Sequence, residues 1–210
     1  MRASKALVLA TRNEGKIAEF RQLLSEFDIQ IMSLKDFGPL PPVIEDGETF
    51  EENAYKKAHA TAKAIALPAL SDDSGLTVAA LGGAPGVRSA RYAGENAADE
   101  ENNRKLLREM EGISNREAAF ECVIAIAVPR GPALIYEGRC EGLVATELRG
   151  DKGFGYDPLF FYEPFGKTFA ELSVHEKNTV SHRGHAMAEL KKEFDEVLAW
   201  LEQRMAEEPA

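Results

Sequence analysis

The sequence predicts a single α/β domain, residues 1–210, with an elongated central mixed β-sheet flanked by helices. Three observations lead to this fold class. Strand and helix patterns alternate in the first half of the chain, two β-rich segments resemble a hairpin in the second half, and no linker or repeat divides the chain. Alternating elements are typical of a sheet covered by helices, and a hairpin adds antiparallel pairing to it.

Composition excludes several classes of protein. A hydrophobic content of 44% is enough for a sizeable core, and two cysteines are too few for a disulfide scaffold or a four-cysteine zinc site. The net charge of −10 disfavours a general nucleic-acid or membrane-surface binder. No apolar run approaches the roughly 18 residues of a membrane helix, and residues 6–10 are too short for a signal-peptide core. We therefore expect a cytoplasmic protein.

The first third of the chain reads as two strands and two helices. Ile17, Phe20, Leu24 and Phe27 recur at helical spacing after a short apolar run. Thr49 has the position of a helix cap, with Glu52 three residues later and Pro68 beyond the end. The expected elements are a strand at 6–10, a helix at 13–27, a strand at 28–33, a loop at 38–42 and a helix at 50–66.

The remainder mixes strands, loops and two helices. An Asp-Asp-Ser-Gly sequence at 72–75 is expected to interrupt a strand. The expected elements are strand pieces at 69–71 and 75–79, a loop at 82–86, a helix at 97–110, strands at 118–128 and 133–146, a loop at 150–158 and a helix at 182–205.

The segment between the first strand and the first helix is a candidate phosphate-binding loop. A helix N-terminus attracts anions, and Lys16 in the first turn adds a full positive charge. The P-loop itself is excluded, because Ala10 and Ile17 replace its first glycine and its hydroxyl residue. The alternative is an ordinary junction capped by Asn13 with a solvated Lys16. The candidate residues are Thr11, Arg12, Asn13, Glu14, Gly15 and Lys16.

Acidic residues suggest a magnesium site. Asp72 and Asp73 follow an apolar run, so they are expected at a strand end, where ligands of open α/β sheets bind. Both can reach one site only if the chain bends at 74–75, since strand side chains alternate between faces. Glu45 is a further candidate ligand for Mg²⁺. The alternative is a common Asp-rich turn.

Lysine, aromatic and histidine residues complete the candidates. Asn53 and Lys57 share one helix face, which either lines a pocket or is solvated.

Glycines around Phe154 would let a flat ligand stack on its ring, with Asp157 accepting hydrogen bonds from a base. The alternative is a tight turn with core aromatics. Ser181 is expected to cap the last helix. His182 and Arg183 are expected to donate hydrogen bonds to a carbonyl or phosphate group. A zinc site at His182, His185 and Glu189 is disfavoured, because His-x-x-His lacks the i, i+4 spacing of a helical zinc pair.

Together the segments resemble the inosine-triphosphate pyrophosphatase family, the house-cleaning dITP/XTP pyrophosphatases. Each segment alone is weak, but all six occur in the family's order over nearly the whole chain. The matching segments are Leu9–Lys16, Glu45–Ala54 with Lys57, Ser71–Leu76, Gly82–Tyr92, Gly153–Pro158 and Ser181–Gly184.

The resemblance implies two lobes around an active-site cleft, a homodimer, and Mg²⁺-dependent hydrolysis of ITP, dITP and XTP to monophosphate and pyrophosphate. It implies that Glu45 and Asp73 serve the metal, that Asp73 is the general base, and that Asp72 and Lys57 belong to the catalytic group. The family often has a second acid beside the residue that matches Glu45; here Ile44 precedes Glu45 and Asp46 follows it. The implied substrate-binding residues are Thr11–Lys16, Ser74, Phe154, Gly155, Tyr156, Asp157, Lys177, His182 and Arg183.

The expected chemistry is in-line attack of a water on the α-phosphorus, with selectivity from the 6-keto oxygen of the base. Two other functions stay open at this point. One is a metal-dependent phosphatase that releases orthophosphate. The other is a nucleotide sensor without turnover, against which the Asp72–Asp73 pair argues, because a sensor gains little from acids near a triphosphate.

Overall fold

The computed structural model describes residues 6–207, and the chain divides into two compact units. The first unit comprises Met1–Asp73, Val123–Glu137 and Ala186–Ala210, of which residues 6–207 are described. The second comprises Ser74–Cys122 and Gly138–His185. The border between Asp73 and Ser74 falls inside one of the candidate site segments.

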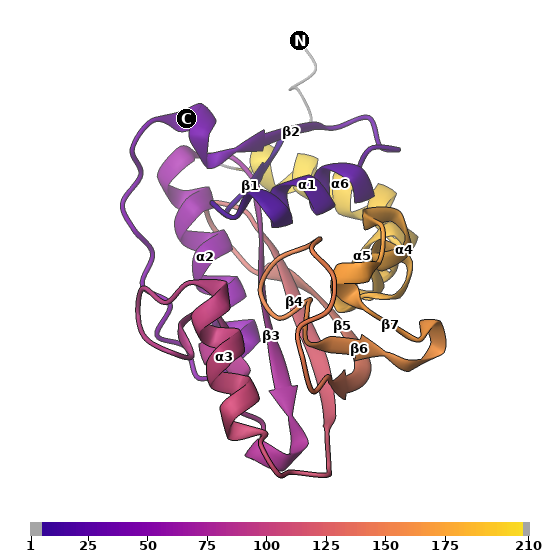
Figure 1. The fold of residues 1–210 in the computed structure, drawn as a ribbon. Coiled ribbons are helices and arrows are strands. Elements are labelled where there is room, and N and C mark those ends of the chain that lie inside the picture. Colours follow the sequence, from indigo (N-terminus) through magenta and orange to yellow (C-terminus); the bar gives the residue numbers. More distant parts are fainter. Residues whose placement is uncertain (1–5, 208–210) are drawn as a thin grey trace. The chain divides into compact units, whose positions relative to one another are not determined.

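A mixed β-sheet is the central element of the fold (Figure 1). The strand order is β2-β1-β3-β4-β5-β6-β7. β1 is parallel to β2 and β3, whereas β6 is antiparallel to β5 and β7. The predicted fold class, a mixed sheet with helices, is therefore confirmed. The strands are β1 (Ala6–Leu9), β2 (Gln30–Ser33), β3 (Ala69–Val78), β4 (Glu117–Ala127), β5 (Ala133–Val144), β6 (Phe160–Tyr162) and β7 (Lys167–Thr168).

Six α-helices flank these strands in the described part of the chain. None of them is both long and apolar enough to cross a membrane. The α-helices are α1 (Glu14–Leu23), α2 (Phe50–Ile65), α3 (Asp99–Glu109), α4 (Val174–Val180), α5 (His182–Lys192) and α6 (Phe194–Ala206). Short 3₁₀ helices lie at Leu34–Phe37, Ala79–Leu81, Gly86–Arg91, Glu163–Phe165 and Phe169–Glu171.

Alanines determine how closely α2 packs in the first unit. Ala54, Ala58 and Ala62 recur every four residues, so they lie on one helix face, and all three are fully buried. They pack in one core cluster with Val8 of β1 and Val123 of β4. Because alanine side chains are short, the helix backbone comes close to the strands, which places the polar residues of its first turns beside β3.

Aromatic rings dominate the core of the second unit. The ring centroids of Phe120 and Phe160 lie 4.7 Å apart, as do those of Phe160 and Phe169. Leu106 of α3 and Tyr156 belong to the same buried cluster. Offset and edge contacts between rings at these distances are favourable. Tyr156 thereby anchors the glycine-aromatic loop, residues 153–158, in this core.

The expected interruption at residues 72–75 is wrong. β3 runs without a break from Ala69 to Val78, through both aspartates. It lies between β1 and β4 in the sheet, so both of its edges have strand neighbours. Backbone pairing on two sides outweighs the local turn preference of Asp-Asp-Ser-Gly.

Several predicted boundaries also differ. α1 ends at Leu23 rather than residue 27, and β2 begins at Gln30. The predicted helix at 182–205 is two helices that meet at Glu193, and α4 was not predicted. Phe194 and Leu201, beyond the break, are buried as expected. Because the apolar spacing continues across Glu193, periodicity alone did not indicate that the helix breaks there.

Candidate active site

The loop between β1 and α1 is ordered by its own side chains. The Asn13 side chain accepts from the backbone N–H of Lys16 at 3.1 Å, so its predicted role as N-cap is confirmed. Thr11 Oγ1 in turn accepts from the Asn13 N–H at 3.2 Å. Arg12 and Glu14 are exposed, and Glu14 forms an ion pair with Lys35. The loop thus presents a fixed helix N-terminus.

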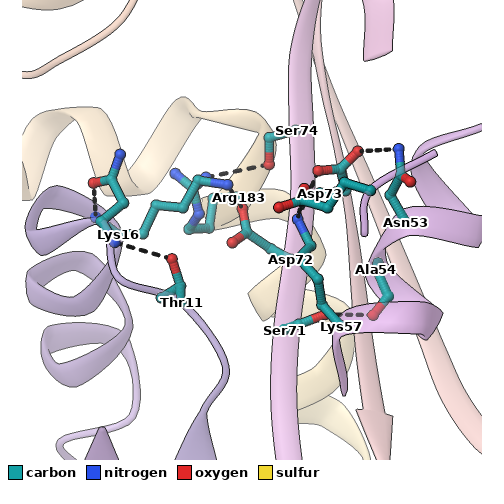
Figure 2. A network of polar contacts seen from close by, with 12 residues as sticks. Thr11, Lys16, Asn53, Ala54, Lys57, Ser71, Asp72, Asp73, Ser74 and Arg183 are labelled. Carbon is teal, nitrogen blue, oxygen red and sulfur yellow. Dashed lines mark hydrogen bonds and ion pairs between the residues drawn. The ribbon is translucent and has the colours of Figure 1, made fainter. Parts of the chain in front are cut away.

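Lys16 is not a solvated lysine. Its Nζ lies 2.9 Å from Oδ2 of Asp72, whose side chain is 0% exposed. A buried carboxylate needs a charged partner, and Lys16 supplies it. Lys16 is therefore held at the start of α1 with its cation directed toward β3 (Figure 2).

Lys57 links two further carboxylates. Its Nζ lies 2.7 Å from Oδ1 of Asp73 and 2.9 Å from Oε2 of Glu45. The interpretation of this helix face as solvated is wrong, because the Lys57 side chain is only 13% exposed. Lys56, the preceding residue, pairs with the exposed Asp46 instead. One ammonium group thus brings the carboxylates of Glu45 and Asp73 near each other.

Asn53, one turn before Lys57 on α2, connects the same two segments through its amide. Its Nδ2 donates to Oδ2 of Asp73 at 3.3 Å, and its Oδ1 accepts from the Gly47 N–H at 2.8 Å. Asn53 is 1% exposed. A Cβ on Gly47 would lie 2.7 Å from Asn53 Oδ1, so the contact requires glycine. The loop that bears Glu45 is therefore anchored to α2 and β3.

Burial raises the pKa of Asp73 above its ordinary value, although the charges of Lys57 and Lys16 act to lower it. For Lys57, burial acts to lower the pKa, but the charges of Asp73, Asp72 and Glu45 outweigh it and raise the pKa. Lys57 therefore stays protonated at neutral pH. Asp73 is a stronger proton acceptor than an exposed aspartate, because its conjugate acid is weaker.

Asp72 and Asp73 contact different lysines. They are neighbours in a continuous strand, so their side chains leave β3 toward opposite faces. Figure 2 shows them directed to different partners, Lys16 for Asp72 and Lys57 for Asp73. The bend expected at residues 74–75 is thus absent, yet the two pairs stay close enough that the charges of Lys16 and Asp72 still act on Asp73.

The second unit holds the glycine-aromatic loop. Oδ2 of Asp157 accepts from the Phe154 N–H at 3.0 Å and pairs with Nζ of Lys177 at 2.6 Å. The side chains of Lys177 and Asp157 are 5% and 3% exposed. A Cβ on Gly153 would lie 2.0 Å from the same carboxylate oxygen. Asp157 thus shapes the loop, and the expected contact of its carboxylate with a base stays a prediction.

Phe154 presents a half-buried ring beside two cations. Nζ of Lys177 lies 4.6 Å from the ring centroid, and Cζ of Arg183 lies 5.9 Å from it. Both distances are within the range of cation–π attraction. Arg183 is 1% exposed and donates to Ser74 Oγ at 3.2 Å (Figure 2). This arrangement suits a flat ligand with hydrogen-bond acceptors.

Other predicted residues have structural partners. Tyr156 is buried and its hydroxyl donates to the Ser89 carbonyl at 2.9 Å, so it anchors the loop. The His182 ring stacks on Phe120, with centroids 4.6 Å apart. Ser181 Oγ accepts from the Gly184 N–H, as expected of a cap for α5. His185, the second histidine of the His-x-x-His pattern, contacts the Arg139 carbonyl oxygen through Nδ1.

Sequence reasoning missed Asp99 and Asn103, which contact Gly155 from α3. A signal for Asn103 existed. Asn103, Leu106 and Met110 recur at i, i+3 and i+7, so the asparagine lies on the apolar face of its helix. A polar residue at a buried position is an informative exception to ordinary burial.

Glu45 and Asp73 fit the ligand preferences of Mg²⁺. In residues 6–207 no three His, Cys, Asp or Glu side chains are grouped to hold a metal by protein ligands alone. Mg²⁺ does not require such a group, since it often binds one or two carboxylates together with substrate phosphates and water. Both carboxylates contact the same ammonium group, that of Lys57.

Comparisons with known proteins agree on one family. The family model described as "Ham1 family" matches residues 7–193. A dITP/XTP pyrophosphatase of Syntrophobacter fumaroxidans is 61% identical over 202 residues, which are 96% of this chain and 87% of that protein. One of Desulfotalea psychrophila is 59% identical, over 96% and 91%. A HAM1 protein structure from Coxiella burnetii is 46% identical, with a TM-score of 0.84 over 91% of this chain and 98% of that one.

Proposed function

This chain belongs to the Ham1 family, and we propose that it is a nucleoside-triphosphate pyrophosphatase that hydrolyses dITP, XTP and ITP to the monophosphate and pyrophosphate. The similar proteins named dITP/XTP pyrophosphatase support this substrate class. The observation that carries the proposal is the arrangement of Lys57, which holds two carboxylates on one protonated amine. A fixed lysine can neutralise phosphate charge, and carboxylate oxygens beside it can hold a divalent cation that binds phosphates, so the arrangement suits a polyphosphate substrate.

Lys16, Lys57 and the start of α1 bind the phosphates in this proposal. Lys16 and Lys57 are cations held in place by buried aspartates, so they need little reorganisation when a triphosphate binds. The capped N-terminus of α1 adds backbone N–H groups and a partial positive charge. These groups stabilise the negative charge that develops on the leaving pyrophosphate.

Glu45 and Asp73 would hold the Mg²⁺ ion. When bound, the ion supplies charge neutralisation of the phosphates and lowers the pKa of a coordinated water. The chain's own contribution is to keep the two carboxylates together. Lys57 does this by direct ion pairs, and Asn53 does it by holding the Gly47 N–H and the Asp73 carboxylate.

Asp73 would also be the general base. Its Oδ1 contacts Lys57 and its Oδ2 contacts Asn53, so the carboxylate has a fixed orientation. Its raised pKa makes it a better acceptor for the proton of the water that attacks the α-phosphorus. Asp72 would act through Lys16, whose cation it holds.

The glycine-aromatic loop and the start of α5 bind the base in this proposal. Phe154 offers a ring for stacking, with the Lys177 ammonium group 4.6 Å from its centroid, and Arg183 and His182 are donors suited to the 6-keto oxygen of hypoxanthine or xanthine. Adenine presents an amino group at that position and would leave buried donors unpaired. A site of this kind can reject the wrong group by roughly 10⁴-fold.

We also propose that the protein is a cytoplasmic homodimer. The family resemblance supports the dimer, and the composition supports the location. Light scattering coupled to size-exclusion chromatography gives the mass in solution. A mass of one 23.0 kDa chain at working concentration would contradict the dimer.

A product-resolved assay tests the function. The purified protein is incubated with ITP, XTP, dITP, ATP and GTP, with Mg²⁺ or with EDTA, and pyrophosphate and orthophosphate are measured separately. We expect pyrophosphate from ITP, XTP and dITP only when Mg²⁺ is present. Orthophosphate as the product would favour the phosphatase, and tight ITP binding without turnover would favour the sensor.

A further inference from the structure

Helix α3 holds one glycine of the aromatic loop by both of its backbone groups. The Gly155 N–H donates to Oδ2 of Asp99 at 2.6 Å, and the Gly155 carbonyl accepts from Nδ2 of Asn103 at 2.9 Å. Asp99 and Asn103 are four residues apart, so they lie on the same face of α3. Gly155 has a φ of +61°, which favours glycine.

The contacts with α3 complete a series that fixes consecutive loop residues. On one side of Gly155 the Phe154 N–H is held by Asp157, and on the other side the Tyr156 hydroxyl is held by the Ser89 carbonyl. Every residue from 154 to 157 therefore has a hydrogen bond to another segment or across the loop. The Phe154 ring is the half-buried group that this framework presents.

Asn103 has a feature that packing alone does not explain. It is 4% exposed, and its Oδ1 is buried with no hydrogen-bond partner in the described part of the chain. The contact with Gly155 sets the orientation of the Asn103 amide, because the Gly155 carbonyl oxygen can accept only from the amide nitrogen, Nδ2. A buried acceptor without a partner is unfavourable, and such exceptions occur at functional sites.

We propose that Asp99 and Asn103 are positioning residues that determine purine selectivity by fixing the plane of the Phe154 ring. The inference rests on the proposed function, in which this loop binds the base. The site recognises a base by stacking on the Phe154 ring and by hydrogen bonds to the edge of the base. Both contacts can form together only if the Phe154 ring has one orientation. Freeing Gly155 would weaken base recognition and leave the phosphate chemistry, carried by other residues, unchanged.

The test compares Asp99→Ala with Glu100→Ala. Glu100 is the neighbouring exposed acid in the first turn of α3, so the control removes the same charge from the same helix end. Steady-state kinetics with ITP and GTP give KM and kcat for each variant. Calorimetry of each variant with inosine monophosphate and with inorganic pyrophosphate measures binding without turnover.

For Asp99→Ala we expect KM for ITP to rise roughly 3- to 10-fold, with kcat within about twofold of the parent protein. The preference for ITP over GTP falls, and the affinity for inosine monophosphate falls while that for pyrophosphate is unchanged. Glu100→Ala behaves like the parent. Asn103→Asp, which places an acceptor against the Gly155 carbonyl, shifts the same quantities in the same direction provided its melting curve stays cooperative.

Two results would overturn the inference. In one, Asp99→Ala leaves KM, selectivity and monophosphate affinity unchanged. In the other, monophosphate and pyrophosphate binding weaken equally, which indicates general destabilisation. A failure of the proposed function is separate, because the parent protein itself would then produce no pyrophosphate from ITP.

Discussion

The ammonium group of Lys57 lies 2.7 Å from the Oδ1 atom of Asp73, with both side chains largely withdrawn from water. These residues are 16 positions apart and come from a helix and a strand. Their pairing fixes the protonation state of the lysine and the orientation of the carboxylate together. Several consequences of this relationship can be measured.

Asp73→Asn should lower kcat for ITP by about 10²- to 10⁴-fold, because the amide cannot accept the water proton. The fold should remain, since asparagine has the same shape and Lys57 keeps its contact with Glu45. Circular dichroism and the ITP assay measure the two properties. Turnover near that of the parent protein would show that Asp73 is not the base.

Lys57→Met should move the acidic limb of the kcat/KM profile to higher pH. Asp73 acts as a base only when ionised, so activity falls as the pH falls through its pKa. Burial already raises that pKa, and Lys57 is the largest influence lowering it. Removing the lysine therefore raises the pKa further, which is read from pH profiles at one saturating Mg²⁺ concentration.

Lys56→Met is the matched control for this pH shift. Lys56 is the adjacent lysine of α2, and it pairs with the exposed Asp46 rather than with Asp73. Its removal should leave the acidic limb in place. A limb that stays at the parent position in Lys57→Met as well would contradict the electrostatic coupling.

Gly47→Ala should destabilise the protein by about 1–3 kcal/mol, because its Cβ would lie 2.7 Å from Asn53 Oδ1. In an Asn53→Ala background the same change should cost less, since the contact with the amide is gone and the close contact with Glu52 Cβ at 2.9 Å remains. Denaturant unfolding of the two single variants and the double variant gives the coupling energy. Strict additivity of the two changes would refute the anchoring role of the Asn53 amide.

Lys177→Met should lower the free energy of unfolding by about 3–5 kcal/mol, because it removes the ammonium group that pairs with the buried Asp157 carboxylate at 2.6 Å. Adding Asp157→Asn should recover much of the loss, since the amide oxygen can still accept from the Phe154 N–H. Chemical denaturation of both variants measures this.

Lys192→Met provides the comparison for the buried pair. Lys192 pairs with Glu189 on an exposed helix surface, and such pairs contribute about 0–1 kcal/mol. A loss as small for Lys177→Met as for this variant would mean that water reaches the Lys177–Asp157 pair.

Local features of the sequence were sufficient to predict the helix starts and the family. Asn13 and Thr49 cap their helices as their residue types and spacings indicate. The six segments in order predicted the family correctly. These signals were readable because capping involves neighbouring residues, and because the order of segments is itself a property of the sequence.

The tertiary structure decided how the candidate residues are paired. Local rules favoured an interruption of the strand at residues 72–75 and allowed a solvated lysine at position 57, and both were wrong. A strand continues through the aspartates because sheet neighbours on both edges bind its backbone. Lys57 is buried because the alanine face of α2 packs closely on the core. Both outcomes depend on the distance between segments far apart in the chain, which spacing along the sequence does not encode.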